Sequence, residues 1–183
     1  GTVIRKSTPG PVFIGGKPGD PVHTRVKITG IKFVCDNIPD RTGFTMSFMN
    51  GFMNEFSDLS FGDISGTGNQ QNGLEISGTA HWVTDIRGIG LQREVGLEAE
   101  TGILMKSFHG TNKYKNIQHE TGSRIVFEGE RNSSIYGLHG ERSAIVLINS
   151  SWNVFSGGYF IDGEVSLDER SACNRFDNIG GAN

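Results

Sequence analysis

The sequence contains few of the residues that mark several common protein classes. Its two cysteines, Cys35 and Cys173, lie near opposite ends of the chain, so they supply neither a disulfide framework nor a zinc site. We expect both to be buried free thiols. Only 5 prolines occur and no Gly-X-Y period, which excludes collagen. No apolar run approaches the ~20 residues of a membrane-spanning helix.

Charge clusters, helical periodicity and familiar catalytic motifs are also missing. The 17 basic residues are scattered and the formal net charge is −3, which favours neither nucleic acid nor insertion into an anionic membrane. No segment sustains a period of 3.6, so long helices are not expected. There is no phosphate-binding loop, GxSxG, HExxH or EF-hand calcium loop. We therefore expect no cofactor and no dedicated metal site.

The first residues, GTVIRKS, contain neither an initiator Met nor a secretory signal. They have the composition of a strand, so we expect a fragment of a longer chain. The length of 183 residues fits a single domain, 1–183. Glycine is abundant, at 27 residues, roughly twice the average usage of about 7%. Many turns are therefore expected.

A short pattern, Asn-x-aromatic-x-x-aliphatic, recurs along the chain. Its first positions are Val26, Asn54, Thr84, Asn112, Ser133, Asn153 and Asn174, with spacings of 28, 30, 28, 21, 20 and 21 residues. Two residues on come Ile28, Phe56, Ile86, Tyr114, Ile135, Phe155 and Phe176. Five residues on come Ile31, Leu59, Ile89, Ile117, Leu138, Gly158 and Ile179. Self-similarity at such periods indicates stacked supersecondary units.

A second apolar stripe follows within most repeats, at 43–48, 73–77, 102–108, 124–129 and 144–149. These segments read as short strands between Gly- and Asn-rich corners. Each repeat is therefore expected to form one coil of two or three parallel strands, with coils about 4.8 Å apart.

These columns resemble the right-handed parallel β-helix of the pectate-lyase-like superfamily, over residues 2–181. The resemblance implies an all-β, single-stranded solenoid of about seven coils. It also implies an asparagine ladder at one corner, supplied here by Asn54, Asn112, Asn153 and Asn174. A corner Asn tolerates left-handed backbone and bonds turn amides, so this ladder is expected to be structural.

The coils within 26–111 are about eight residues longer than those within 112–183. The excess lies near 37–42, 64–72 and 95–101, and inserts on consecutive coils emerge on one face. The segment SGTGNQQNG, 65–73, offers uncharged amides that suit sugar hydroxyls. We therefore predict Asn69, Gln70 and Gln71, together with Arg93, as substrate-binding residues; a solvated loop is the alternative.

A column of acids precedes the inserts and continues along the chain: Asp36, Asp63, Glu94, Glu120, Glu141 and Asp162. Carboxylates in register raise one another's pKa, which suits a general acid. The distance between two carboxylates one coil apart would match that in a retaining glycosidase. A larger distance would match that in an inverting glycosidase. Because they adjoin the long loops, the predicted catalytic residues are Asp36, Asp40, Asp63, Glu94, Glu98 and Glu100. Solvent-facing strand-end acids are the alternative.

Trp82 and Trp152 precede repeat starts and so lie near the asparagine corner. Either is a sugar platform or an interface anchor, but a packed, half-buried corner position is favoured. Trp82 is kept as a candidate substrate-binding residue.

Within the superfamily, the short irregular coils and Gly-rich corners look most similar to bacteriophage tailspikes. That resemblance implies a homotrimer in a virion tail, outside the cell, that binds a bacterial surface polysaccharide and cleaves it as an endoglycosidase. Two alternatives remain open: a non-catalytic receptor-binding shaft, and a polysaccharide lyase that uses calcium held by the acid column.

Overall fold

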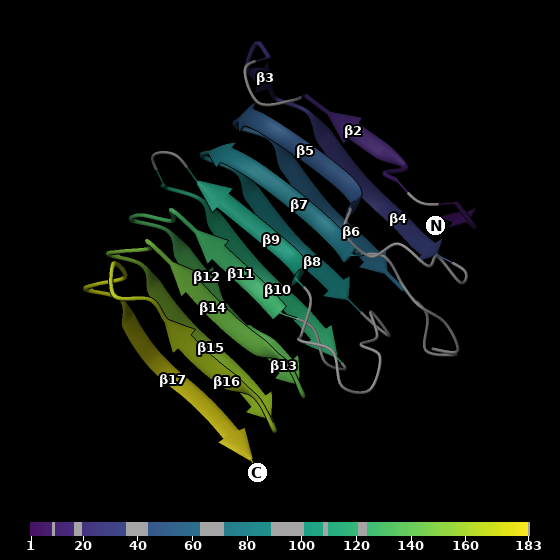
Figure 1. Ribbon diagram of the computed structural model, residues 1–183. Helices are drawn as coiled ribbons and strands as arrows, with labels where there is room; N and C mark the ends of the chain where they lie inside the picture. Colours follow the sequence, from purple (N-terminus) through teal and green to yellow (C-terminus); the bar gives the residue numbers. More distant parts are fainter. Residues whose placement is uncertain are drawn as a thin grey trace.

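The computed structural model describes residues 1–8, 10–16, 20–35, 44–62, 72–88, 101–107, 110–120 and 124–182. These residues form strands and turns, and no helix occurs among them (Figure 1). No helix in the described part of the chain is long and apolar enough to cross a membrane. The all-β prediction is therefore confirmed.

The strands form two sheets, and every strand pair is parallel. The first sheet contains β1 (Thr2–Lys6), β4 (Lys27–Cys35), β6 (Glu55–Phe61), β8 (Trp82–Gly88), β10 (Lys113–Glu120), β12 (Ser134–Tyr136), β13 (His139–Glu141), β15 (Val154–Ile161) and β17 (Arg175–Ala182). The second contains β2 (Phe13–Gly15), β3 (His23–Thr24), β5 (Phe44–Phe52), β7 (Asn72–Thr79), β9 (Thr101–Ser107), β11 (Arg124–Glu128), β14 (Ala144–Ile148) and β16 (Glu164–Leu167).

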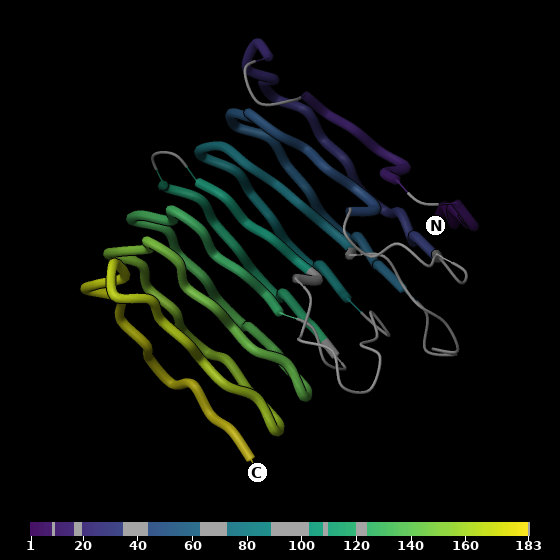
Figure 2. The backbone as a smooth tube through the Cα atoms, in the orientation of Figure 1, coloured from purple at the N-terminus to yellow at the C-terminus, as the bar shows by residue number. Residues whose placement is uncertain are grey.

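From β4 onward the chain alternates between the two sheets, with β12 and β13 together forming one passage through the first sheet, and each passage lies beside the previous one (Figures 1 and 2). We call one passage through both sheets a coil. The alternation explains why both sheets are parallel, because the return path always runs through the other sheet. Stacked parallel strands in two sheets are consistent with the predicted parallel β-helix.

The core lies between the two sheets and consists of side chains in register. Phe56, Val83 and Tyr114 are neighbours on the first sheet, and Leu74, Ile103 and Ile125 are neighbours on the second. All are buried in one hydrophobic cluster. The second-stripe segments predicted from the sequence match β5, β7, β9, β11 and β14. Burial of these in-register columns is the main source of stability.

A left-handed residue in each coil explains the odd spacing of the repeat pattern. In a regular strand, alternate side chains face the core, so apolar residues three apart would face opposite sides. Here each passage through the first sheet from β4 onward contains a residue of positive φ, which in one passage lies between β12 and β13: Gly30, Asp58, Asp85, Asn116, Gly137, Gly157 and Asn178. This residue resets the alternation, so that Phe56 and Leu59 both point inward. We call this line of residues the kink column.

The register corrects the third repeat. Val83, not Ile86, pairs with Phe56 and with Tyr114, and Ile86 pairs with Leu59 and Ile117. The repeat therefore starts at His81 rather than Thr84. The sequence around Thr84 satisfies the same apolar pattern three residues late, and a histidine was not recognised as a substitute for asparagine.

The asparagine corner is a continuous ladder of side chains that accept backbone N–H groups of the preceding coil. The accepting side chains are Asn54, His81, Asn112, Ser133, Asn153 and Asn174, Val26 contributes only its N–H at the first coil, and the donor–acceptor distances lie between 2.7 and 3.3 Å. The predicted structural ladder is therefore present, with His81 as an unpredicted member. His81 Nδ1 accepts from Asn54 N–H, so its Nε2–H is placed to donate to the Ser77 carbonyl at 3.3 Å. Burial lowers the pKa of His81, which keeps the ring neutral.

A buried carboxylate supports the middle of this corner. Glu130 accepts hydrogen bonds from Asn112 Nδ2 at 3.0 Å, from Ser133 Oγ at 2.6 Å and from the Tyr114 hydroxyl. Burial raises the pKa of Glu130 to about 7, while these three donors act in the opposite direction. Burial and the nearby Glu130 also raise the pKa of Tyr114 well above its usual value. The inward side of the corner is thus polar but satisfied.

Candidate functional site

A groove of about 780 Å³ crosses the outer face of the first sheet. It is lined from β4, β6, β8, β10 and β13, and by Gly62 and Gly137 beside those strands. It therefore runs across the strands, along the direction in which the coils stack. The kink column lies along it, because Asp58, Asp85, Asn116 and Gly137 all line its wall. A ligand in this groove would be elongated and would contact several coils.

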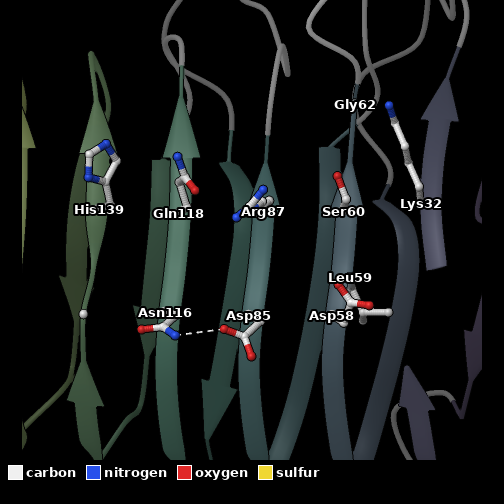
Figure 3. Close-up of a pocket in the computed structure, with 11 residues that line it drawn as sticks. Lys32, Asp58, Leu59, Ser60, Gly62, Asp85, Arg87, Asn116, Gln118 and His139 are labelled. Atoms are coloured by element: carbon white, nitrogen blue, oxygen red, sulfur yellow. Dashed lines mark hydrogen bonds between the residues drawn. The ribbon is translucent and has the colours of Figure 1, made fainter. Parts of the chain in front are cut away.

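Two rows of side chains line the groove, and Figure 3 shows them side by side. The kink row consists of Asp58, Asp85 and Asn116, all exposed. The second row lies two residues further along each strand and consists of Lys32, Ser60, Arg87, Gln118 and His139. One row thus offers carboxylates and an amide, while the other offers basic groups, a hydroxyl and an amide. Such a surface is suited to hydroxyl-rich or charged ligands.

The left-handed backbone restricts the kink row but does not require its charge. Residues with positive φ are favoured as Gly, Asn or Asp. Asn116 and Asn178 satisfy this requirement without charge, as do the glycines of the other coils. The backbone conformation thus permits Asp58 and Asp85 but does not select a carboxylate over an amide, which leaves both carboxylates as candidates for ligand chemistry.

Asp58 and Asp85 occupy equivalent positions on neighbouring strands. Ser57 pairs with Thr84 and Leu59 with Ile86, so the two aspartates lie opposite each other between those pairs. Neighbouring strands are about 4.8 Å apart, and both side chains line the same groove. Asn116 Nδ2 donates to Asp85 Oδ1 at 2.8 Å, as the dashed line in Figure 3 marks. Asp85 is therefore oriented by its neighbour.

Arg87 is the central cation of the second row. Its side chain is exposed, and its guanidinium makes no hydrogen bond or ion pair with other described residues. Some other charged side chains on the surface are paired, as in the Lys27–Glu55 bridge at 2.7 Å and the Lys106–Glu128 bridge at 3.3 Å. The guanidinium of Arg87 is thus available to a ligand.

Most of the residues predicted from the sequence lie outside the described residues. These are Asp36, Asp40, Asp63, Asn69, Gln70, Gln71, Arg93, Glu94, Glu98 and Glu100. Their segments follow directly on β4, β6 and β8, three of the strands that line the groove. Asp63 directly follows Gly62, which lines the groove itself. These residues stay predictions.

The predicted acid column is only partly in register. Glu120 pairs with Glu141, as expected. Glu141, however, pairs with Ile161, so Asp162 lies one residue beyond the column. Asp162 has positive φ and belongs to the turn after β15. Within the described residues no group of three His, Cys, Asp or Glu side chains is arranged as a metal site.

The structure corrects the predicted burial of both tryptophans and of one cysteine. Trp82 is 57% exposed and Trp152 64% exposed, rather than half-buried at a packed corner. Trp82 is the first residue of β8, and Lys113 Nζ lies 5.1 Å from its ring centroid. It does not line the groove. Cys173 is exposed rather than buried.

Sequence reasoning missed Asp58 and Asp85, although a signal was present. Both occupy the fourth residue after a repeat start once the third repeat begins at His81. The other coils have only Gly or Asn at this position, so two acids there stood out. The error in the third repeat hid this column, because it placed Gly88 where Asp85 belongs.

No family model, no curated protein and no solved structure matches this chain. The functional argument therefore rests on the groove itself.

Proposed function

We propose that this protein binds an extended bacterial surface polysaccharide along the groove and cleaves it by hydrolysis. The observation that carries the proposal is the pair Asp58 and Asp85, exposed on neighbouring strands in one elongated groove. The remaining lining is rich in amides, hydroxyls and cations that suit the polar groups of a sugar polymer. The groove crosses successive coils, which suits an extended chain rather than a compact ligand.

The spacing of the two strands that carry the pair favours a retaining mechanism. Retaining glycosidases hold their two carboxyl groups about 5 Å apart, whereas inverting enzymes need about 6.5–9.5 Å. A spacing of one strand, about 4.8 Å, lies close to the shorter distance. Asp85, oriented by Asn116, would attack the anomeric carbon, and Asp58 would protonate the leaving oxygen. Water would then hydrolyse the glycosyl intermediate, with Asp58 as the base.

The finer fold and setting are part of this proposal. We place the chain among right-handed parallel β-helices of the pectate-lyase-like type, with about seven coils. A second left-handed position, one residue before each corner residue, supports that number: Arg25, Met53, Ala80, Thr111, Asn132, Trp152 and Cys173. Right-handed crossovers between parallel strands are the general rule. A virion tailspike, exposed outside the cell and assembled as a homotrimer, is the setting that fits these features.

The test is a screen of immobilised lipopolysaccharide O-chains and capsular polysaccharides, followed by chromatography of every bound polymer. The parent is expected to bind at least one polymer and shorten it. Asp58→Asn and Asp85→Asn are each expected to bind it but to cleave at least about 100-fold more slowly. Full cleavage by both variants would reject this pair and return attention to Asp36, Asp63 and Glu94. Products that absorb like unsaturated uronides would indicate a lyase instead.

A receptor-binding shaft is the second candidate, and the exposure of Trp152 favours it. This residue combines a 64% exposed indole with a left-handed backbone, and neither feature stabilises an isolated chain. An interface between chains would bury the ring. Binding without shortened products, together with a trimer in sedimentation, would support the shaft. A monomer at high concentration would count against it.

A further inference from the structure

An exposed aromatic side chain lies at the β13 end of the groove. Tyr136 ends β12 and directly precedes Gly137, which lines the groove. The ring is 55% exposed. Beside it, His139 also lines the groove, and its ring centroid lies 6.0 Å from that of Tyr159 on the next strand. The polar groove thus passes into an aromatic surface on its β13 and β15 side.

The Tyr136 ring is held in place by the neighbouring coil. A Cβ atom added to Gly157 would lie 3.1 Å from Cε2 of Tyr136, 3.5 Å from Cζ and 3.7 Å from Cδ2. The ring therefore packs against Gly157, and even a Cβ atom there would force the ring to shift by a few tenths of an ångström. Gly157 also has a φ of 62°, so glycine is favoured there both by the backbone conformation and by the contact with Tyr136. One side of the ring rests on backbone, while much of the rest faces solvent.

Such a ring is suited to the apolar side of a pyranose. A sugar ring presents C–H groups on one side, and an aromatic face with its negative charge density attracts them. Because one side of the ring packs against Gly157, part of its conformational freedom is already lost before a ligand binds, which lowers the entropy cost of stacking.

We propose that Tyr136, supported by Gly157, is a stacking platform for one pyranose ring of the bound glycan, at the end of the groove opposite Lys32. This inference rests on the proposed function, since the platform would hold a sugar unit next to those in the polar groove. Tyr159 and His139 continue the same surface toward β15. The platform fixes the position of one sugar relative to Asp58 and Asp85, two to three strands away.

The platform can be tested without knowledge of the polymer. The probe is methyl β-glucopyranoside, whose H1, H3 and H5 all lie on one apolar face. Saturation-transfer NMR with irradiation of the aromatic protons is expected to transfer to these three protons more strongly than to H2 and H4. Tyr136→Ala should reduce the transfer severalfold. Tyr136→Phe should retain it, and Trp152→Ala, which removes an exposed aromatic outside the groove, should leave it unchanged.

The same variants are then measured on any polysaccharide that the parent binds. Tyr136→Ala is expected to weaken that binding about tenfold, whereas Tyr136→Phe changes it little. Face-selective transfer at Tyr136 without any bound polymer would refute the proposed function and keep the platform. A bound polymer that is indifferent to Tyr136→Ala would refute the platform and keep the proposed function. Equal transfer to all sugar protons, or transfer that survives Tyr136→Ala, would also refute the platform.

Discussion

The asparagine corner lies at the start of the first-sheet strands, and the groove lies on the outer face of the same strands. Both use similar polar side chains. At the corner, Asn112 and Glu130 are buried, and each makes several short hydrogen bonds. In the groove, Asp58 and Arg87 are exposed and make no hydrogen bond or ion pair within the described chain. The contrast shows that residue type alone does not separate structural residues from ligand-binding residues. Burial and hydrogen-bond partners distinguish the two groups.

The two left-handed positions of each coil show the same contrast in the backbone. The kink column accepts only Gly, Asp and Asn, whereas the position before the corner also accepts Arg25, Met53 and Trp152. That position is held by backbone hydrogen bonds between coils, as in Met53 N–H to the Thr79 carbonyl at 3.2 Å. The adjacent ladder adds further bonds. A conformation fixed from both sides tolerates residues that would otherwise avoid it.

The largest effect on stability is expected from a change at the corner. Asn112→Leu would leave the His81 N–H without its acceptor and Glu130 without its amide donor, both buried. We expect a loss of about 4 kcal/mol in the free energy of unfolding, measured by denaturant titration. Asn116→Gly is the matched control, because it removes an exposed amide yet keeps the left-handed backbone. A similar loss in both variants would contradict the distinction between corner and groove.

A pH-dependent effect is expected from the buried carboxylate. The pKa of Glu130 is raised to about 7, above the value near 4.5 in the unfolded chain, so the folded state binds the extra proton. Its contribution to stability is therefore complete below pH 4.5 and is lost as the pH rises through about 7. Across this range the parent should lose about 3 kcal/mol relative to Glu130→Gln.

The measurement is the difference in unfolding free energy between parent and variant at pH 5 and pH 8. Glu128→Gln provides the control, because Glu128 is solvent-accessible and paired with Lys106. Its difference from the parent should not change with pH in this range. A Glu130→Gln difference that is equally flat would show that the carboxylate is not buried as described.

A smaller effect distinguishes backbone from charge in the groove. Asp85→Val should destabilise the protein by about 2 kcal/mol, because a β-branched residue disfavours positive φ. Asp85→Asn should change stability by less than about 0.5 kcal/mol, because asparagine tolerates that backbone. The measurement is the free energy of unfolding of the two variants and the parent, by thermal or denaturant unfolding. If Asp85→Asn cost as much as Asp85→Val, the carboxylate would have a structural role.

Much of the fold was predictable, because the side chains that stack in the core appear in the sequence as apolar residues at regular repeats. The strands of the first sheet are indicated by the repeated aromatic position, as at Phe56, Tyr114 and Phe155. The strands of the second sheet are indicated by the second apolar stripe of each repeat. The corner ladder followed from its asparagines. The role of His81 in the ladder could not be predicted, because it depends on a ring nitrogen that accepts a backbone N–H. The spacing of the residues does not show this.

The candidate site was far less predictable. Asp58 and Asp85 look like ordinary polar residues of an alternating strand until the left-handed column is known. Arg87 stands out only because it has no partner among the described residues, and that is a property of its surroundings. The exposure of Trp82 likewise depends on which strand face it occupies. Groove residues come together through coil register, so a shift of three residues in one repeat was enough to conceal them.

The most direct test is to compare the parent with Arg87→Glu on the panel of immobilised bacterial surface polysaccharides. Because Arg87 is exposed and has no partner within the described part of the chain, the variant should unfold within about 0.5 kcal/mol of the parent. We expect the parent to bind at least one polymer and Arg87→Glu to bind it at least about tenfold more weakly. Equal binding by the two proteins would place the glycan elsewhere. A parent that binds no polymer would contradict the proposed function.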